Sequence, residues 1–283
     1  MTDHPGWISV GAYRERMFPV ADGHVVVVVD DRGCYRTAGA STRPTCDAFR
    51  FEPEITAGCA SDPSPAAALA AMGSVGRFRT TSLWDALGTA ITRQVVRAAQ
   101  ARQMYNRISR TFGVRVARPA GAVPTDGYDA AAAPPWHWMF PGPERILELD
   151  DGDFTSVGMA FKRRAMRSAA RAYLDSRREW ETAAPDALLA SLQRTPYVGP
   201  WTAAATVADY TNDWSLYAYD DLAVRTWARR ALPQIDWADD EPTFSRQWRH
   251  LSGRQLASAT LLTLAWGDRV GRSNATSGGA RRR

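Results

Sequence analysis

The order of apolar and polar residues divides this chain into a β-rich beginning and a helical remainder. His24–Asp31 contains five consecutive valines, which is typical of a strand buried on both faces, and glycine-containing turns lie on either side of it. Further strands are predicted at Cys34–Ala38 and Ala48–Ile55. Residues 57–78 are rich in alanine, glycine, serine and proline, and we expect them to form a connector with one short helix.

From Ser82 onward, apolar residues recur at spacings of three and four, the period of an amphipathic helix. Ser82 with Asp85 three residues later predicts a helix start. The pattern up to Phe112 and Gly113 fits either one long helix or two helices with a break near Gln94. Residues 114–139 are rich in proline and alanine and are predicted to form a long loop. Further helices are predicted at residues 143–149, 151–156, 161–179, 185–194, 200–212, 220–230, 241–250 and 253–266.

This pattern predicts an α+β fold that is mostly α. We expect a small β-rich N-terminal domain over residues 1–78 and an all-helical core over residues 79–268. Residues 269–283 end in three arginines and are predicted to be a disordered basic tail.

Composition and charge narrow the class of protein only slightly. The 283 residues are 45% apolar and 23% charged, as in an ordinary globular protein, and no apolar run is long enough to span a membrane. The first residues lack the pattern of a secretion signal, so a cytoplasmic protein is the default expectation. A net charge of +5 and a pI near 9.4 allow a polyanionic partner.

The cysteines and the single lysine bear on the chemistry. Cys34, Cys46 and Cys59 are expected to be reduced thiols, because three cysteines without a secretion signal do not suggest disulfides. Together with His24 they could form a zinc site, but spacings of ten or more residues fit no compact zinc motif. Lys162 is the only lysine in the chain.

A helix–turn–helix motif at residues 192–205 carries the first functional signal. One helix is predicted to end near Arg194 and the next to begin at Pro200, with Val198 and Gly199 in the tight turn between them. The unpaired N–H groups at the start of the second helix could bind an anion such as a DNA phosphate. An ordinary connection inside a helical core is the alternative.

A pair of carboxylates follows about fifteen residues later. Asp220 and Asp221 are adjacent where a turn meets a helix, and Arg225 lies one turn further on. An aspartate at such a position is often only a helix cap.

Together, the hairpin, the spacer and the aspartate resemble the signature of the helix-hairpin-helix DNA glycosylases, L-P-G-[VI]-G-x-x-T-A followed by an aspartate. Ser82–Gly113 resembles the first helical pair of that superfamily. Phe140–Leu147 and Ser156–Arg164 resemble the F-P-T-P and G-M-x-x-K-R segments of its 3-methyladenine DNA glycosylase II branch. These four ordered motifs cover about residues 80–230, so the resemblance implies a helix-hairpin-helix glycosylase core.

The resemblance implies that Asp221 is the catalytic aspartate, supported by Asp220 and Arg225. A carboxylate there would stabilise the cationic sugar that forms when an N-glycosidic bond breaks, and would orient water. Trp201 stands where the bifunctional members carry a catalytic lysine. Because strand cleavage needs an amine that forms a Schiff base, we predict a monofunctional enzyme without AP-lyase activity.

The resemblance also suggests how the target base is held. Trp201, Gln94 and Trp266 are expected to contact the flipped base, with Trp136 and Trp138 as weaker candidates. Val95 is expected to be the wedge that fills the gap in the DNA; a core position on the apolar stripe is the equal alternative.

The hairpin itself should bind the DNA backbone. Phosphate contacts are expected from Thr195, Tyr197, Val198, Gly199, Trp201 and Thr202. The resemblance further implies a monovalent cation on the backbone carbonyls of Thr195, Tyr197 and Val198, as the only cofactor, and no iron–sulfur cluster. Tyr197 replaces the first glycine of the motif, so the turn must avoid a left-handed conformation or accept strain.

Two groups of arginines could add phosphate contacts, although solvated helix faces explain them as well. They are Arg93, Arg97 and Arg102, and Arg163, Arg164, Arg167 and Arg171.

The sequence therefore predicts a monomeric, monofunctional DNA glycosylase of base excision repair that flips a damaged, alkylated base out of double-stranded DNA. One alternative is a non-catalytic DNA-binding relative, in which Tyr197 marks decay of the hairpin. Another is a glycosylase for a hypermodified or antibiotic-damaged base, with the 114–139 insertion as an adaptation.

Overall fold

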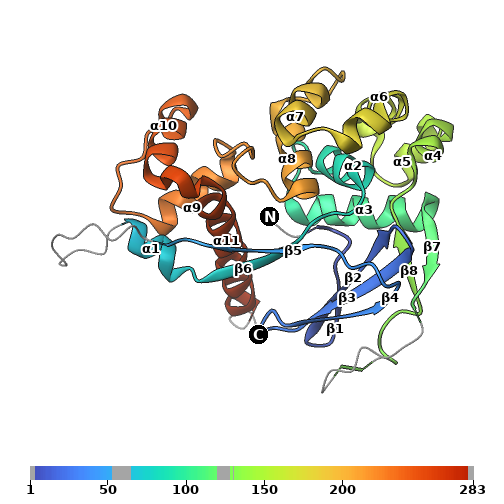
Figure 1. The fold of residues 1–283 in the computed structure, drawn as a ribbon, viewed down its shortest axis with the longest axis horizontal. Coiled ribbons are helices and arrows are strands. Elements are labelled where there is room, and N and C mark those ends of the chain that lie inside the picture. Colours follow the sequence, from blue (N-terminus) through green and yellow to red (C-terminus); the bar gives the residue numbers. More distant parts are fainter. Residues whose placement is uncertain (1–3, 53–64, 120–127, 130, 280–283) are drawn as a thin grey trace. The chain divides into compact units, whose positions relative to one another are not determined.

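A computed structural model describes residues 4–52, 65–119, 128–129 and 131–279 (Figure 1). The chain forms two compact units. The larger unit comprises Asp3–Thr45 and Phe78–Thr211, and the smaller unit comprises Met1–Thr2, Cys46–Arg77 and Asn212–Arg283. Each unit is described by itself below.

The larger unit contains a four-stranded antiparallel sheet in the order β1-β2-β3-β4. Its strands are β1 (Ile8–Val10), β2 (Tyr13–Val20), β3 (Gly23–Val29) and β4 (Tyr35–Gly39). The valine run predicted to be a buried strand is β3, and its side chains are buried on both faces of the sheet. Val26 and Val28 pack with Met17 on one face, whereas Val25 and Val27 pack with Phe18 on the other.

Helices make up most of the rest of the larger unit. They are α2 (Leu83–Arg93), α3 (Ala98–Phe112), α4 (Pro143–Glu148), α5 (Asp151–Ser156), α6 (Arg163–Thr182), α7 (Pro185–Gln193) and α8 (Pro200–Thr211), with a short 3-10 turn η1 (Ala160–Lys162) before α6. The predicted helix start is confirmed, because the Ser82 side chain accepts a hydrogen bond from the backbone N–H of Asp85. Of the two alternatives for this segment, the structure has two helices with a break near Gln94, since α2 ends at Arg93 and α3 begins at Ala98.

The sheet is joined to α2 through a buried polar cluster centred on Asp85. The Asp85 carboxylate lies 3.2 Å from the guanidinium of Arg16 and accepts a hydrogen bond of 2.9 Å from the hydroxyl of Tyr105. His4 is the third partner, 3.2 Å from the same carboxylate. Burial alone would raise the pKa of Asp85, but His4 and Arg16 outweigh it and hold that pKa well below its usual range.

Residues 114–139 differ from the long loop that we predicted. Their ends pair as an antiparallel ribbon of β7 (Val114–Ala117) and β8 (Trp136–Met139). Each strand has only four residues, too short for a clear alternation of apolar and polar positions. The ribbon forms because β8 packs against β2 of the main sheet, which is a tertiary contact.

The smaller unit contains a strand pair and the last helices of the chain. Its elements are β5 (Cys46–Arg50), α1 (Pro65–Ala71), β6 (Ser74–Phe78), α9 (Leu222–Ala231), α10 (Glu241–Ser252), η2 (Gly253–Gln255) and α11 (Leu256–Gly279). Strand β6 was not predicted. The disordered tail predicted from residue 269 is wrong for residues 269–279, because α11 continues through them; each added residue of a helix that is already formed gains one backbone hydrogen bond. Residues 280–283 lie outside the described residues.

The fold class is as predicted: mostly helical, with an antiparallel sheet near the N-terminus. The chain crosses between the units after residues 2, 45, 77 and 211. The crossing after residue 77 lies one residue before the domain boundary that we predicted, and the one after residue 211 falls inside the predicted helical core. Strands β1–β4 belong to the same unit as α2–α8. Among the described residues, no helix combines the length and apolarity that crossing a membrane requires.

Candidate nucleic-acid interface and candidate catalytic residue

The predicted hairpin is present in the larger unit, between α7 and α8. It closes with a hydrogen bond of 3.0 Å from the N–H of Val198 to the carbonyl of Thr195, and the Val198 side chain is buried. The first hydrogen bond of α8 runs from Ala203 N to Gly199 O. The amides of Trp201 and Thr202 precede it, so the helix itself offers them no acceptor, and such amides are suited to a phosphate.

Tyr197 takes the left-handed backbone conformation that the motif's glycine would adopt freely. Its φ is +69°, and its side chain is 59% exposed. A side chain with a β-carbon is strained there by about 1–2 kcal/mol. The hairpin therefore keeps its shape by accepting strain, the second of the two outcomes that the sequence left open.

Val95 lies in the turn between α2 and α3 and points into solvent. Its side chain is 102% exposed, and its φ is +54°. A β-branched residue in this region of backbone space is a genuine outlier, because its side chain crowds the peptide backbone. The alternative interpretation of Val95 as a core residue is therefore wrong, and an exposed apolar tip is the shape that a DNA wedge requires.

Gln94 connects this turn to the hairpin. Its side-chain amide donates hydrogen bonds to the carbonyl of Tyr197, at 3.1 Å, and to the hydroxyl of Thr202, at 2.7 Å. We predicted a contact between Gln94 and the base, but the amide nitrogen is already occupied by these two acceptors. Gln94 thus fixes the position of the turn between α2 and α3, here called the wedge turn after the predicted role of Val95, relative to the hairpin.

Lys162 also contacts this turn. Its ammonium donates a hydrogen bond to the carbonyl of Gln94, and the residue is only 3% exposed. Burial lowers the pKa of Lys162 to about 8. The sequence marked Lys162 as the only lysine but gave no hint of this contact, which joins positions 68 residues apart.

Replacing Gln94 with leucine should loosen the hairpin. Both hydrogen bonds are lost, and the half-buried Thr202 hydroxyl is left without this donor, so the free energy of unfolding should fall by about 1 kcal/mol. Urea unfolding measures that change, and duplex-DNA titration should show weaker binding. Gln103→Leu, on the exposed face of α3, is the matched control. Unchanged stability and binding in Gln94→Leu would show that the hairpin does not depend on this link.

Trp201 is the second residue of α8 and is partly exposed. The N–H of its indole ring is buried and has no hydrogen-bond partner among the described residues. Buried donors are nearly always satisfied, so an unpaired one beside helix-start amides is a natural contact for a bound acceptor. This agrees with, but does not test, its predicted role at the base.

Asp221 caps α9 in the smaller unit. One carboxylate oxygen accepts a hydrogen bond of 2.8 Å from the hydroxyl of Tyr217, and the other faces the N–H of Ala223 at 3.5 Å. Tyr217 is itself buried and packs against Trp214, with ring centres 4.9 Å apart. The carboxylate is therefore held in a fixed orientation and remains partly exposed to solvent.

The neighbours of Asp221 differ in what they do. Asp220 is exposed. The guanidinium of Arg225 lies 2.9 Å from the carboxylate of Glu241 and also donates to the carbonyl of Asp239. Arg225 therefore ties α9 to α10, and the predicted support of Asp221 by its side chain is not what the contacts show.

Trp266 packs within the smaller unit. Its ring lies edge-on to that of Trp227, with centres 6.3 Å apart. Trp227 in turn lies so close to Gly267 that an added β-carbon would be 2.3 Å from the ring. Trp266 is partly exposed beside this contact, so part of its ring is still available to a ligand.

The predicted site residues thus fall into two groups. Gln94, Val95 and residues 195–202 lie together in the larger unit, whereas residues 220–225 and Trp266 belong to the smaller unit. The sequence missed two residues that position these groups, Lys162 and Tyr217. The signal for Tyr217 was its place four residues before Asp221, in the turn that leads to the helix.

The predicted cation would use the hairpin carbonyls. Those of Thr195 and Tyr197 each already accept one hydrogen bond, from Val198 N and from the Gln94 side chain. A carbonyl oxygen has a second lone pair, so these oxygens can still ligate a monovalent cation, and that cation stays a prediction. In the described part of the chain, no three His, Cys, Asp or Glu residues group as metal ligands would.

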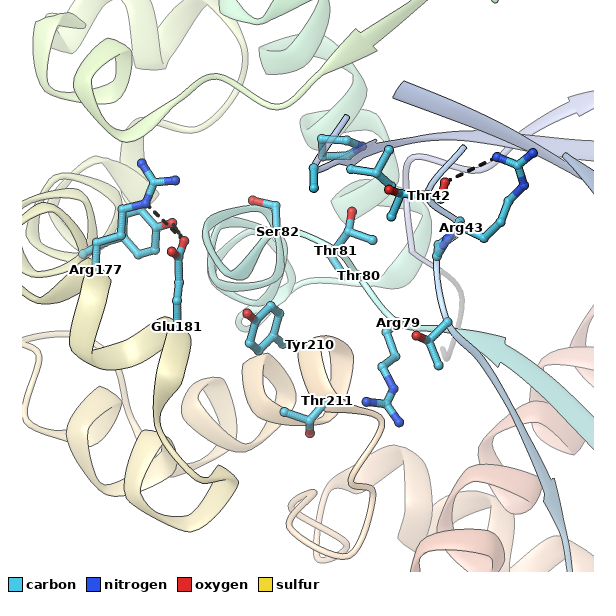
Figure 2. Close-up of a pocket in the computed structure, with 16 residues that line it drawn as sticks. Thr42, Arg43, Arg79, Thr80, Thr81, Ser82, Arg177, Glu181, Tyr210 and Thr211 are labelled. Atoms are coloured by element: carbon cyan, nitrogen blue, oxygen red, sulfur yellow. Dashed lines mark hydrogen bonds and ion pairs between the residues drawn. The ribbon is translucent and has the colours of Figure 1, made fainter. Parts of the chain in front are cut away.

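A separate cavity of about 600 Å³ lies in the larger unit (Figure 2). It is lined by Ser82 at the start of α2, by Tyr210 and Thr211 at the end of α8, and by Arg79. The wedge turn and the hairpin lie at the opposite ends of these two helices, and α2 alone is about 16 Å long. None of the predicted site residues lines this cavity.

Comparison with known proteins supports the fold. No protein-family sequence model matches the chain, and no curated protein matches it. Among solved structures, the 3-methyladenine DNA-glycosylase from Archaeoglobus fulgidus matches 93% of this chain and 90% of its own, with a TM-score of 0.67 at 14% identity. The chain has the fold of the helix-hairpin-helix DNA glycosylases.

Other glycosylases share this fold. The Schizosaccharomyces pombe 3-methyladenine DNA glycosylase in complex with abasic DNA covers 66% of this chain and 81% of its own, at 17% identity and a TM-score of 0.50. The Clostridium acetobutylicum 8-oxoguanine glycosylase/lyase in complex with double-stranded DNA covers 69% and 62%, at 16% identity and a TM-score of 0.51. Since one of these is a glycosylase/lyase, the fold alone does not determine whether a protein also has lyase activity.

Proposed function

We propose that this protein is a monofunctional DNA glycosylase that flips a damaged, alkylated base out of double-stranded DNA and hydrolyses its N-glycosidic bond with Asp221. The observation that carries the proposal is the Asp221 carboxylate, held at the start of α9 by the buried Tyr217 hydroxyl in a chain with the glycosylase fold.

The larger unit would supply DNA binding and base extrusion. The amides that begin α8 bind a phosphate of the backbone, and Val95 enters the stack where the target base leaves it. Extruding a base costs a few kcal/mol, and least for a damaged or mispaired base. Gln94 and Lys162 hold the wedge turn against the force of insertion.

Asp221 would act on the sugar. As the bond between C1′ and the base nitrogen breaks, its electrons leave with the base, and positive charge develops at C1′. The carboxylate stabilises that charge. A water oxygen then bonds to C1′, and the water proton passes to the carboxylate or to solvent. An alkylated base that already carries a positive charge leaves as a neutral molecule and needs no protonation.

Release of free base from methylated duplex DNA tests the proposal. We expect release by the wild-type protein and loss of release in Asp221→Asn. A protein that binds duplex DNA but releases no base from any lesion of a panel would instead be the non-catalytic DNA-binding relative. Release confined to a bulky hypermodified or antibiotic-derived adduct would assign the alternative substrate.

The reaction should leave an abasic site without cutting the strand. The only lysine, Lys162, is 3% exposed and bonded to the Gln94 carbonyl, so its amine is not free to attack a sugar aldehyde. Borohydride added during turnover should therefore trap no covalent protein–DNA adduct, and strands should break only after alkali. An adduct that disappears in Lys162→Ala would overturn the monofunctional assignment; one that persists would point to the N-terminal amine.

A further inference from the structure

One stretch of the larger unit contains arginines but no acidic residue. Residues 86–125 contain seven arginines and no aspartate or glutamate. Three of the arginines are engaged inside the unit: Arg93 pairs with Asp209, Arg102 donates to the carbonyl of Trp7, and Arg118 pairs with Glu15. The other four are exposed: Arg97, Arg107, Arg110 and Arg115.

These exposed arginines follow α3 from the wedge turn to the ribbon. Arg97 immediately precedes α3, close in sequence to Val95. Arg107 and Arg110 lie on the helix face opposite its buried residues, and α3 leads within two residues into β7, which carries Arg115 (Figure 1). Within the described part of the chain, the guanidinium groups of Arg97, Arg107 and Arg110 make no hydrogen bond or ion pair.

The ribbon adds two exposed aromatic side chains to this path. Trp136 and Trp138 are 41% and 38% exposed, and they lie on the same face of β8 because they are two residues apart. Arg115 pairs with Trp138 in the ribbon register and places its guanidinium 4.4 Å from the centre of the Trp136 ring. The three side chains therefore form one cationic, aromatic face.

Contacts on the opposite face of the ribbon keep the two tryptophans exposed. His137, between the two tryptophans, is buried and lies 3.1 Å from the carboxylate of Glu15 in β2. Val116 and Met139 pack against the valine face of the main sheet. Turning the tryptophans inward would shift the ribbon by one residue and expose His137 and its neighbours, so the aromatic face is held outward.

We propose that the exposed face of α3 and this ribbon form a second DNA contact, which binds the nucleic acid flanking the lesion. The surface, here called the flank surface, consists of Arg97, Arg107, Arg110, Arg115, Trp136 and Trp138. The inference rests on the proposed function. Exposed arginines in a stretch of sequence without aspartate or glutamate fit a phosphate backbone, and exposed tryptophans fit the faces of bases or sugars.

The length of α3 sets the reach of this contact. Fifteen residues of helix span about 22 Å, which corresponds to about 6–7 base pairs at about 3.4 Å each. A duplex with about four base pairs on each side of the lesion should therefore not reach the ribbon, whereas one with about twelve should.

Binding of duplexes with short and long flanks tests the proposal. Wild-type protein should bind the long duplex more tightly. Trp136→Ala/Trp138→Ala should bind it at least about fivefold more weakly, the lower end for loss of one stacked base, yet bind the short duplex as wild type does. Arg107→Ala/Arg110→Ala should reduce the slope of log affinity against log salt by about 1–2 on the long duplex alone. Leu174→Ala and Arg178→Ala, exposed changes on α6, are the matched controls.

A third duplex, with a short double-stranded core and single-stranded overhangs, distinguishes paired from unpaired flanks. Weakening by the tryptophan variants on either long substrate supports the proposal and identifies which form is bound. Equal affinity of wild type and variants for all substrates overturns it. Base release from the short duplex reports the proposed function separately: it should be unchanged in Arg107→Ala/Arg110→Ala, and its absence in wild type would leave a flank effect on binding intact.

Discussion

Asp221→Asn should lower base release by about 10²–10³-fold, the usual effect of removing one preorganised charge from a transition state. The change is isosteric, so the effect can be assigned to the charge. Asparagine caps helices as well as aspartate does, and its amide oxygen can still accept the hydrogen bond from Tyr217. The melting temperature should therefore change little. Single-turnover release of base from methylated duplex DNA measures the rate.

Two further variants determine whether the effect belongs to Asp221 alone. Asp220→Asn removes an equal charge from the exposed neighbour and should retain nearly full activity. Tyr217→Phe keeps the Asp221 charge but removes the hydroxyl that orients it, so release should fall by a smaller factor, about tenfold. If Asp220→Asn abolished release while Asp221→Asn did not, the catalytic assignment would move by one residue. Full activity in both would remove the aspartate from the mechanism.

Much of the fold could be predicted because local patterns agreed with it. Five consecutive β-branched valines bounded by turns favour a strand covered on both faces, and β3 has that position. The Ser82 cap followed from local sequence, since capping involves neighbours within one turn, whereas the same pattern left open whether the helix breaks after Arg93.

The ribbon could not be predicted from its own residues. Its strands are short and separated by a long proline-rich segment, and they are stabilised by contacts with β2. The partner of His137 is Glu15, more than a hundred positions earlier in the chain. Local propensity carries no information about such a contact.

The candidate site, like the fold, could be predicted from the sequence only in part. The order of motifs located Asp221 and the hairpin, but the contacts that orient them are tertiary: Lys162 meets Gln94, and Arg225 meets Glu241. The left-handed backbone at Val95 could not be expected from the residue, since valine is among the residues least suited to it.

Two strained residues lie on either side of one polar link. Val95 and Tyr197 both have positive φ, and Gln94 precedes the first and binds the carbonyl of the second. Strain of this kind persists only where surrounding contacts enforce it, and it gathers at functional sites. The Lys162 ammonium and the Gln94 amide are the contacts that can enforce it here. The turn is thus held in an unfavourable conformation that presents an apolar side chain to solvent.

Val95→Asn should therefore stabilise the protein while impairing its proposed activity. Asparagine tolerates the left-handed region, and the valine side chain buries nothing that would be lost, so the free energy of unfolding should rise by about 1 kcal/mol. For a protein of this size the melting temperature should increase by about 2–4 °C. Base release from fully paired duplex should fall at least about tenfold, because a polar side chain fills the vacated stack poorly.

Val95→Ile is the matched control, since it keeps a β-branched apolar tip and a similar backbone strain. It should show no gain in melting temperature and should release base from paired duplex nearly as fast as wild type. On a lesion opposite a gap, where no stacked partner must be displaced, Val95→Asn should recover most of its rate. Equal rates for Val95→Asn and wild type on paired DNA would show that Val95 is not a wedge, and a lower melting temperature would show that its backbone is not under strain.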